Sequence, residues 1–79
     1  MYIATFHTHL GAMTFRNTLL SLGDDSAIMM PVPRALSASC GTCVRFELTF
    51  DPDRMYDEDL DQVVEVLDGA FKTLFVNDD

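Results

Sequence analysis

Residues 43–50 read "CVRFELTF" and show the most regular alternation in the chain. Every second residue is large and apolar, and the residues between them are mostly polar or charged. Because successive side chains of a β-strand point to opposite faces, this pattern predicts a strand with one buried and one solvent-facing side. The predicted buried set is Val44, Phe46, Leu48 and Phe50, and the predicted exposed set is Cys43, Arg45, Glu47 and Thr49.

The segment before this strand predicts two further strands and a helix. Residues 2–7, "YIATFH", alternate in the same way and are rich in β-branched and aromatic residues, which favours a strand. Between residues 9 and 22 apolar residues recur every three or four positions. This spacing predicts an amphipathic helix with Thr8 as its N-cap and Gly23 just past its end. Residues 27–30, "AIMM", predict a second strand.

The segment after the alternating strand predicts a second helix. Apolar residues recur at helical spacing between residues 60 and 74, and acidic residues crowd the first turn, where the helix dipole favours negative charge. Asp59 and Gln62 could form a capping pair at its start. Gly69 could end this helix early, and residues 72–76, "KTLFV", would then form a fourth strand.

These elements predict the order β-α-β-β-α, with or without a final strand, in a single domain of residues 1–79. Two helices on one face of a small sheet would bury the apolar sides of all elements. We therefore expect an α+β fold, a small two-layer sandwich with the ferredoxin-like, split β-α-β arrangement. In such a unit the first two strands run parallel, and their ends meet the start of the first helix at one edge of the sheet.

The charge of the chain is concentrated in its second half. Residues 1–50 carry three basic and three acidic residues, whereas residues 51–79 carry ten acidic residues against Arg54 and Lys72, so the net charge of −8 arises there. This balance argues against binding nucleic acid through its phosphates. We expect the acidic half to be a solvated face or, alternatively, a docking surface for a basic partner.

The apolar content of the chain indicates a globular protein that does not enter a membrane. No apolar run approaches the roughly 18 residues of a membrane span. The N-terminus lacks the basic start and the small-residue cleavage site of a secretory signal. Without an export signal, a chain with only the two cysteines of one C-x-x-C motif is expected in the reducing cytoplasm.

The loop of residues 31–43, "PVPRALSASCGTC", joins the second predicted strand to the third and contains both cysteines. In the expected fold this loop lies at the same edge of the sheet as the end of the first strand and the start of the first helix. The residues expected on this shared rim are His7, Thr8, His9, Arg34, Cys40 and Cys43.

Cys40 is the candidate reactive residue of the rim. A thiol near a helix N-terminus, a histidine or an arginine ionises more readily to the nucleophilic thiolate. Gly41 would let the backbone come close behind the sulfur, and Pro33 would restrict the conformations of the loop. A structural role for Cys43, a dithiol of both cysteines and a zinc site with the two histidines stay open, although the spacing is typical of neither a zinc finger nor a thioredoxin.

The opening "MYIATFHTHLGAMTF" and the later run "MPVPRALSASCGTCVRF" resemble the small prokaryotic family of selenium/sulfur carrier-like proteins. The resemblance covers nearly the whole chain and is most specific at residues 33–41. It implies that Cys40 holds the carried atom and that Pro33, Arg34, Ser37 and Gly41 shape the loop. The family pattern centres on Cys40 and Gly41, and a cysteine at position 43 is less characteristic of it.

Together these observations predict a carrier that holds sulfur or selenium on Cys40 as a persulfide or selenosulfide for transfer to a partner protein, rather than a stand-alone enzyme. Neither a cofactor nor a resident metal is expected. Cys43 could resolve the persulfide, and His7 or His9 could favour the thiolate of Cys40. The alternatives are a thiol-disulfide or metal-binding accessory module that uses Cys40 and Cys43, and a pure interaction domain. The expected partners are donor and acceptor proteins, and an open sheet edge could also pair with a second copy.

Overall fold

The computed structural model of the chain describes residues 1–36 and 41–77. Its strands and helices follow the order β1, α1, β2, β3, α2, β4, β5. This is a mixed α+β fold, as the sequence predicts. The bounds of the elements are β1 Tyr2–Phe6, α1 His9–Ser21, β2 Ile28–Pro31, β3 Thr42–Phe46, α2 Pro52–Met55, β4 Leu60–Leu67 and β5 Ala70–Val76.

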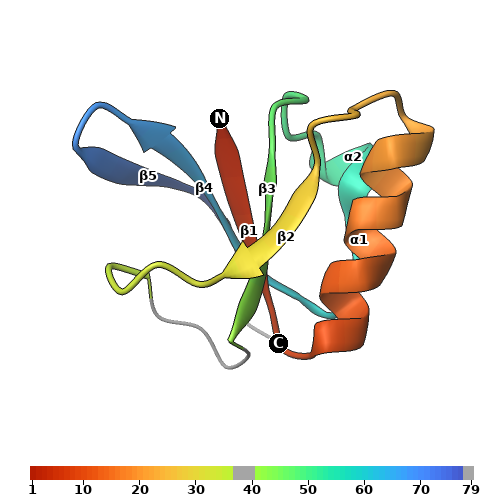
Figure 1. Ribbon diagram of the computed structural model, residues 1–79, viewed down its shortest axis with the longest axis horizontal. Coiled ribbons are helices and arrows are strands. Elements are labelled where there is room, and N and C mark those ends of the chain that lie inside the picture. The colour runs from red at the N-terminus through yellow and green to blue at the C-terminus, as the bar shows by residue number, and fades with distance from the viewer. Residues whose placement is uncertain (37–40, 78–79) are drawn as a thin grey trace.

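The five strands form one sheet in the order β2-β3-β1-β4-β5, and every neighbouring pair is antiparallel. Because β3 lies between β1 and β2, these two strands run in the same direction, as predicted, and α1 connects them. Figure 1 shows α1 along one side of the sheet and the β4–β5 hairpin extending away from it. The ends of β1 and β2 therefore lie at the same edge of the sheet.

The first helix forms as its sequence predicts. Thr8 is its N-cap, and the Thr8 side-chain oxygen accepts a hydrogen bond from the backbone N–H of Gly11. Just beyond its last turn Gly23 has a φ of 100°, a conformation that glycine adopts without steric cost. The buried side of α1 packs on the sheet, where the rings of Phe15 and Phe46 meet edge to face with centroids 5.5 Å apart.

The second predicted helix is wrong. Residues 60–74, expected as a helix, form most of a β-hairpin, in which β4 and β5 are joined by a turn at Gly69 with a φ of 74°. The apolar spacing of this segment fits either structure, but its many β-branched and aromatic residues favour strands. Pairing of β4 with β1 decides the outcome, because it satisfies a β1 edge that a helix would leave open. The alternative strand at residues 72–76 is confirmed.

α2 is a single turn of four residues, so the expected layer of two helices is reduced to one long helix. Its start is stabilised by Asp51, whose carboxylate accepts the backbone N–H of Asp53 at 3.0 Å. The fifth strand is a feature that the expected ferredoxin-like order lacks. Within residues 1–36 and 41–77, no helix is long and apolar enough to cross a membrane.

β3 ends at Phe46, although the alternation predicts a strand as far as Phe50. The backbone N–H groups of Glu47 and Leu48 each donate to Oδ2 of Asp24 at 2.8 Å. A side chain therefore replaces the neighbouring strand as the acceptor for these two groups. Asp24 lies in the turn between α1 and β2, so this contact ties that turn to the end of β3.

Candidate functional site

The loop between β2 and β3 is anchored at both ends. The Val32 backbone N–H donates to the carbonyl oxygen of Gly41 at 3.1 Å, which extends the β2–β3 pairing by one step. The Leu36 N–H donates to the carbonyl oxygen of Pro33 at 3.0 Å and closes a tight turn. Pro33 is half-buried in this turn, and Arg34 is exposed. The first part of the loop is therefore an ordered turn that presents a cation to solvent.

Two of the candidate residues in this loop, Ser37 and Cys40, lie outside the described residues. Gly41, which closes the loop, is exposed, and a Cβ placed on it would meet none of the described atoms within 4 Å outside its chain neighbours. The described part of the chain therefore leaves open space beside Gly41.

The described first part of the loop packs on the face of the sheet opposite α1. A second apolar cluster forms on that face around Ile3, Cys43 and Val64, and the loop residues Val32 and Leu36 pack against it. Neighbouring residues of a strand point to opposite faces, so this cluster is separate from the larger one beneath α1. Both faces of the central strands are therefore apolar. Val32 and Leu36 of the loop pack on one face, and α1 packs on the other.

Cys43 lies on the side of β3 that the alternation predicts to be exposed, yet its exposed fraction is 0%. The prediction is wrong for this residue because the loop covers this face. The Cys43 thiol donates to the carbonyl oxygen of Pro31 at 3.7 Å. A buried thiol in apolar surroundings is typically structural and inert. In the observed arrangement Cys43 is therefore a core residue and not a surface nucleophile.

His9 and the start of β3 lie next to each other, as predicted for the rim. Nδ1 of His9 lies 3.3 Å from Oγ1 of Thr42, and the two side chains share a hydrogen bond. In the neighbouring row of the sheet, Thr5 of β1 pairs with Cys43. His9 is exposed, so its ring lies at the surface next to the residue that follows Gly41.

His7 is bonded through its backbone to another part of the rim. It follows β1, is half-buried, and its backbone N–H donates to the carbonyl oxygen of Asp59 at 2.9 Å. This bond ties the end of β1 to the segment that precedes β4. The other histidine, His9, contacts Thr42 at the start of β3 through its side chain.

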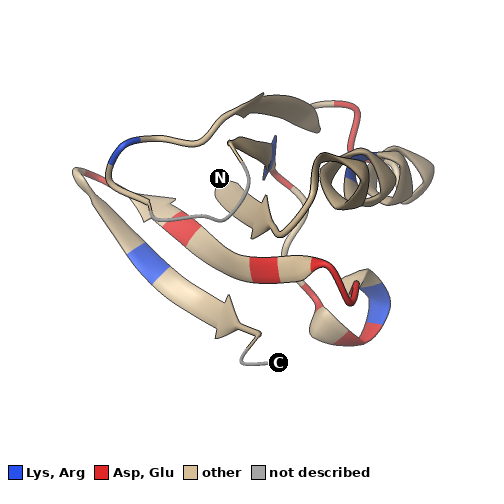
Figure 2. Cartoon of the chain, turned by 90° about the horizontal axis from the view of Figure 1, so that it is seen from below, with Lys and Arg blue, Asp and Glu red and all other residues tan. Residues whose placement is uncertain are grey.

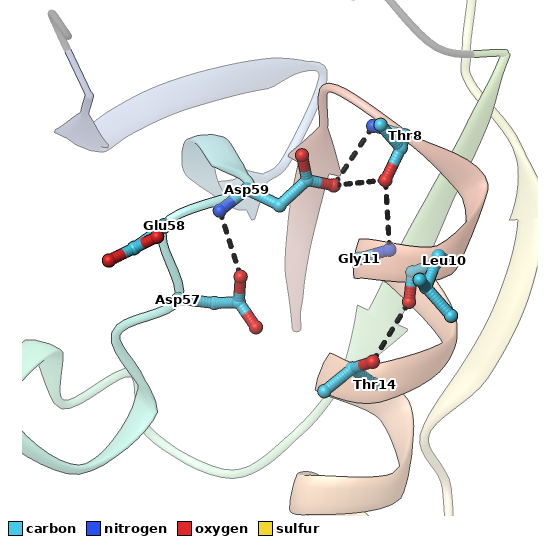
Figure 3. A pocket seen from close by; sticks show the side chains of 7 residues that line it. All are labelled: Thr8, Leu10, Gly11, Thr14, Asp57, Glu58 and Asp59. Atoms are coloured by element: carbon cyan, nitrogen blue, oxygen red, sulfur yellow. Dashed lines mark hydrogen bonds between the residues drawn. The ribbon is translucent and has the colours of Figure 1, made fainter.

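The N-terminus of α1 is occupied by the carboxylate of Asp59, which was expected to cap a helix of its own segment. Oδ2 of Asp59 accepts hydrogen bonds from the backbone N–H of Thr8 at 2.9 Å and from its hydroxyl at 2.6 Å (Figure 3). The expected capping pair of Asp59 with Gln62 is wrong, because that segment is not helical. A negatively charged carboxylate at this position interacts favourably with the positive end of the helix dipole. The dipole is therefore already compensated before any thiolate could use it.

Gly11 provides the space for this carboxylate. A Cβ on Gly11 would overlap the Asp59 side chain, with Cγ at 2.6 Å and Cβ at 2.7 Å. A glycine in the first turn of a helix is unfavourable unless something needs the room, and this is the signal from which the contact could have been suspected. The contact itself joins residues 51 positions apart, so no local pattern predicts it.

A pocket of about 460 Å³ opens beside this cap, between the start of α1 and residues 57–59 (Figure 3). Its carboxylates are partly engaged within the chain, since Oδ1 of Asp57 accepts the backbone N–H of Asp59 at 2.8 Å. The side chain of Glu58 points away from the Thr8 cap in the same view. Among the described residues no group of three or more histidine, cysteine or acidic side chains is placed to hold a metal ion.

Asp24 is a second carboxylate whose structural role the sequence does not reveal. It is nearly buried, and its Oδ1 accepts both the backbone N–H of Ser26 at 3.0 Å and the Ser26 hydroxyl at 2.5 Å. Burial alone would raise the pKa of Asp24, but the hydrogen bonds from Ser26, Leu48 and Glu47 together outweigh it and lower the pKa. Its role is to hold the turn before β2 against the end of β3.

The fold and the loop define a class of small α+β protein in which an anchored, proline-containing loop covers one face of the sheet. Residues 1–52 match the sequence model of the family described as "Putative Se/S carrier protein-like". The chain therefore belongs to this family. No curated protein and no solved structure matches the chain.

The matched segment contains β1, α1, β2, the loop and β3, and it ends at the start of α2. The β4–β5 hairpin lies outside the match, yet β4 contributes Leu60, Val63 and Val64 to the core at 0–1% exposure. The region that carries the family resemblance is thus completed structurally by a hairpin that lies outside the matched residues.

Proposed function

We propose that this protein carries sulfur or selenium on Cys40, as a persulfide or selenosulfide, and transfers it to a partner protein. The observation that carries the proposal is the family match over residues 1–52, which includes the loop with Cys40. The anchored loop supports it, because a carrier needs its reactive atom on a surface segment that a partner can approach. Donor and acceptor proteins are implied, and the chain would not act as a stand-alone enzyme.

The transfer needs no external oxidant or reductant. The Cys40 thiolate attacks the outer sulfur of a donor persulfide, R–S–SH, so that one S–S bond breaks in the donor and one forms on Cys40. The products are Cys40–S–SH and the donor thiolate, R–S⁻, and atoms and charge balance. An acceptor thiolate then attacks the outer sulfur of Cys40–S–SH in the same way, and Cys40 leaves as the thiolate.

Two rim residues are proposed to favour the thiolate form of Cys40. Arg34 is exposed in the turn of the same loop and supplies a positive charge. His9 is exposed next to Thr42, two residues after Cys40. The N-terminus of α1 is the weaker contributor, because Asp59 already caps it. His7 is tied to Asp59 through its backbone and is not required by the proposal.

A single-cysteine mechanism is favoured over a dithiol. A dithiol or metal-binding accessory module would need Cys43, whose sulfur is buried in the cluster with Ile3 and Val64. Release of hydrosulfide by a Cys40–Cys43 disulfide would require the buried Cys43 sulfur to become accessible. The burial of Cys43 therefore supports the carrier over the accessory module.

The test is intact-protein mass spectrometry after incubation with a cysteine desulfurase and cysteine, and separately with the desulfurase and selenocysteine, which presents selenium at the oxidation level of a persulfide, R–S–SeH. The proteins compared are the wild type, Cys40→Ser and the matched control Cys43→Ser. We expect one added sulfur or selenium atom on the wild type and on Cys43→Ser, and none on Cys40→Ser. An adduct that needs both cysteines would favour the dithiol, and the absence of any adduct on a folded wild type would refute the carrier proposal.

A further inference from the structure

The strand β5 forms an edge of the sheet and exposes apolar side chains along most of its length. Six of its seven residues are exposed, and they include Phe71 at 37%, Leu74 at 41% and Val76 at 52%. Lys72 is the only charged residue in the strand, which contains no proline. Edge strands normally carry charges, prolines or other devices that prevent another strand from pairing with them. Leu74 forms a bulge, but residues 70–73 pair regularly with β4.

The opposite edge of the sheet is protected in the usual way. β2 has only four residues and ends at Pro31, which lacks a backbone N–H, and the chain then turns into the anchored loop. Of the two edges, β5 is therefore the longer one, and it exposes three large apolar side chains, whereas β2 exposes Ile28.

Acidic residues lie at both ends of β5. Asp68 is in the turn that precedes it. At the other end, the Asn77 backbone N–H donates to the carbonyl oxygen of Asp61 at 2.9 Å, and the Asn77 side chain donates to the carbonyl oxygen of Glu58 at 3.4 Å. Figure 2 shows acidic positions along β4 and in the segment before it. A strand that pairs with β5 would thus meet negative charge at each end and apolar side chains between.

These charges disfavour a second copy of the chain as the occupant. In an antiparallel self-pairing of β5 centred near Thr73, the Asp68 end of one copy would face the Asn77 end of the other, which lies beside Asp61 and Glu58. Like charges opposite each other across strands are destabilising, and this contact would occur twice in a symmetric pair. A basic segment would instead meet opposite charge at both ends.

We propose that β5 is the docking site for an extended segment of a partner protein that adds to the sheet as a sixth strand, with apolar residues in its middle and lysine or arginine at both ends. The seven residues of β5 span about 24 Å at about 3.4 Å per residue, which sets the separation of the two basic ends. Main-chain hydrogen bonds to β5 give affinity, and the charges at the ends give selectivity. This site does not depend on carrier chemistry, so it remains in Cys40→Ser.

The probe is a synthetic peptide whose seven central residues match the length of β5 and alternate valine with threonine, with lysines at both ends. A second peptide has the same centre and glutamates at both ends. Binding is followed by NMR of the amide groups and by calorimetry. We expect the lysine-ended peptide to shift the β5 amide signals, to bind about tenfold more tightly than the glutamate-ended peptide, and to weaken as salt rises.

Matched variants separate strand addition from general charge effects. Leu74→Lys and Met13→Lys add the same charge at apolar residues of nearly equal exposure, 41% and 43%, but only the first lies in β5. We expect Leu74→Lys to lower the affinity about tenfold or more and Met13→Lys to leave it within about twofold. Asp68→Asn should lower the affinity for the lysine-ended peptide. The control Asp25→Asn, in the turn that follows α1, should leave this affinity unchanged.

Three results would overturn the proposal. One is equal affinity for the two peptides, and another is a set of shifted amides that excludes β5. The third is a dimer in sedimentation experiments that Leu74→Lys dissociates, since the occupant of β5 would then be a second copy. None of these outcomes bears on whether Cys40 accepts sulfur, so this proposal and the carrier proposal can fail separately.

Discussion

Replacing Asp24 by asparagine should strongly destabilise the protein although it hardly changes the shape of the side chain. Each carboxylate oxygen of Asp24 accepts two hydrogen bonds, Oδ1 from Ser26 and Oδ2 from Glu47 and Leu48. The amide nitrogen of asparagine cannot accept, so two donors lose their acceptor whichever oxygen is replaced.

A hydrogen bond to a charged group contributes about 1.5–3 kcal/mol, so the loss of two predicts a decrease of at least about 3 kcal/mol in the free energy of unfolding. We expect the lower end because Asp24 is 7% exposed, and water can reach it. A chain of 79 residues is stable by only about 4–12 kcal/mol, so the change is large. The expected decrease in Tm is about 12–24 °C, measured by circular dichroism.

The pH dependence gives a second, independent check. The pKa of Asp24 is lowered in the folded state, so its contribution to stability is complete above the unfolded pKa of about 3.9 and is lost as pH falls through the folded value. The difference in the free energy of unfolding between the wild type and Asp24→Asn should therefore be constant from neutral pH to about pH 4 and shrink below it. A loss under about 1 kcal/mol at neutral pH, or a difference that does not shrink in acid, would refute this reasoning.

Three further predictions concern Gly11, Cys43 and the aromatic contact of the hairpin. Gly11→Ala should cost about 1–2 kcal/mol, because displacement of Asp59 outweighs the better helix propensity of alanine. The same substitution should stabilise an Asp59→Ala background by up to about 1 kcal/mol, and urea denaturation that shows the same sign in both backgrounds would contradict the explanation. In Cys40→Ser, Cys43 should react with a thiol reagent at least about tenfold more slowly in the native state than in urea, and equal rates would show that Cys43 is accessible. Phe75→Ala should cost about 2–4 kcal/mol, because the ring packs against Phe50 and Tyr56 with centroids 5.7 and 6.3 Å away, and a Tm shift below about 4 °C would contradict this.

The elements that could be predicted are those whose signals are local. The helix α1 has its cap, its apolar spacing and its terminal glycine within one continuous segment, so its bounds follow closely from the sequence. The Thr8 cap and Gly23 are both confirmed. β1 and the first part of β3 follow from the alternation of side chains in the same way.

The candidate site could be predicted only in part. The sequence identifies the loop from its prolines and cysteines, and the parallel course of β1 and β2 predicts that His9 meets the start of β3, as it does. The sequence does not indicate that the loop packs on the sheet and buries Cys43. Alternation identifies two faces of a strand, and whether a distant loop covers the second face depends on where that loop is anchored.

Contacts between distant residues explain the remaining differences. Asp59 caps a helix 51 residues earlier, and Asp24 accepts N–H groups 23 and 24 residues later. The sequence around each aspartate therefore does not indicate its role. The segment of β4 and β5 has apolar residues at spacings that fit a helix as well as a hairpin. Its structure was decided by β1, which has a free edge for β4 to pair with.

The sequence by itself determined the α+β class, the capped helix, the acidic second half and the family to which the chain belongs, because each of these depends on the order and type of nearby residues. The tertiary structure alone decided that residues 60–76 form a hairpin, that Asp59 occupies the start of α1, that Cys43 is buried and that β5 is left as an open edge. Each of these depends on unpaired backbone groups and apolar faces that find their partners only when the chain has folded.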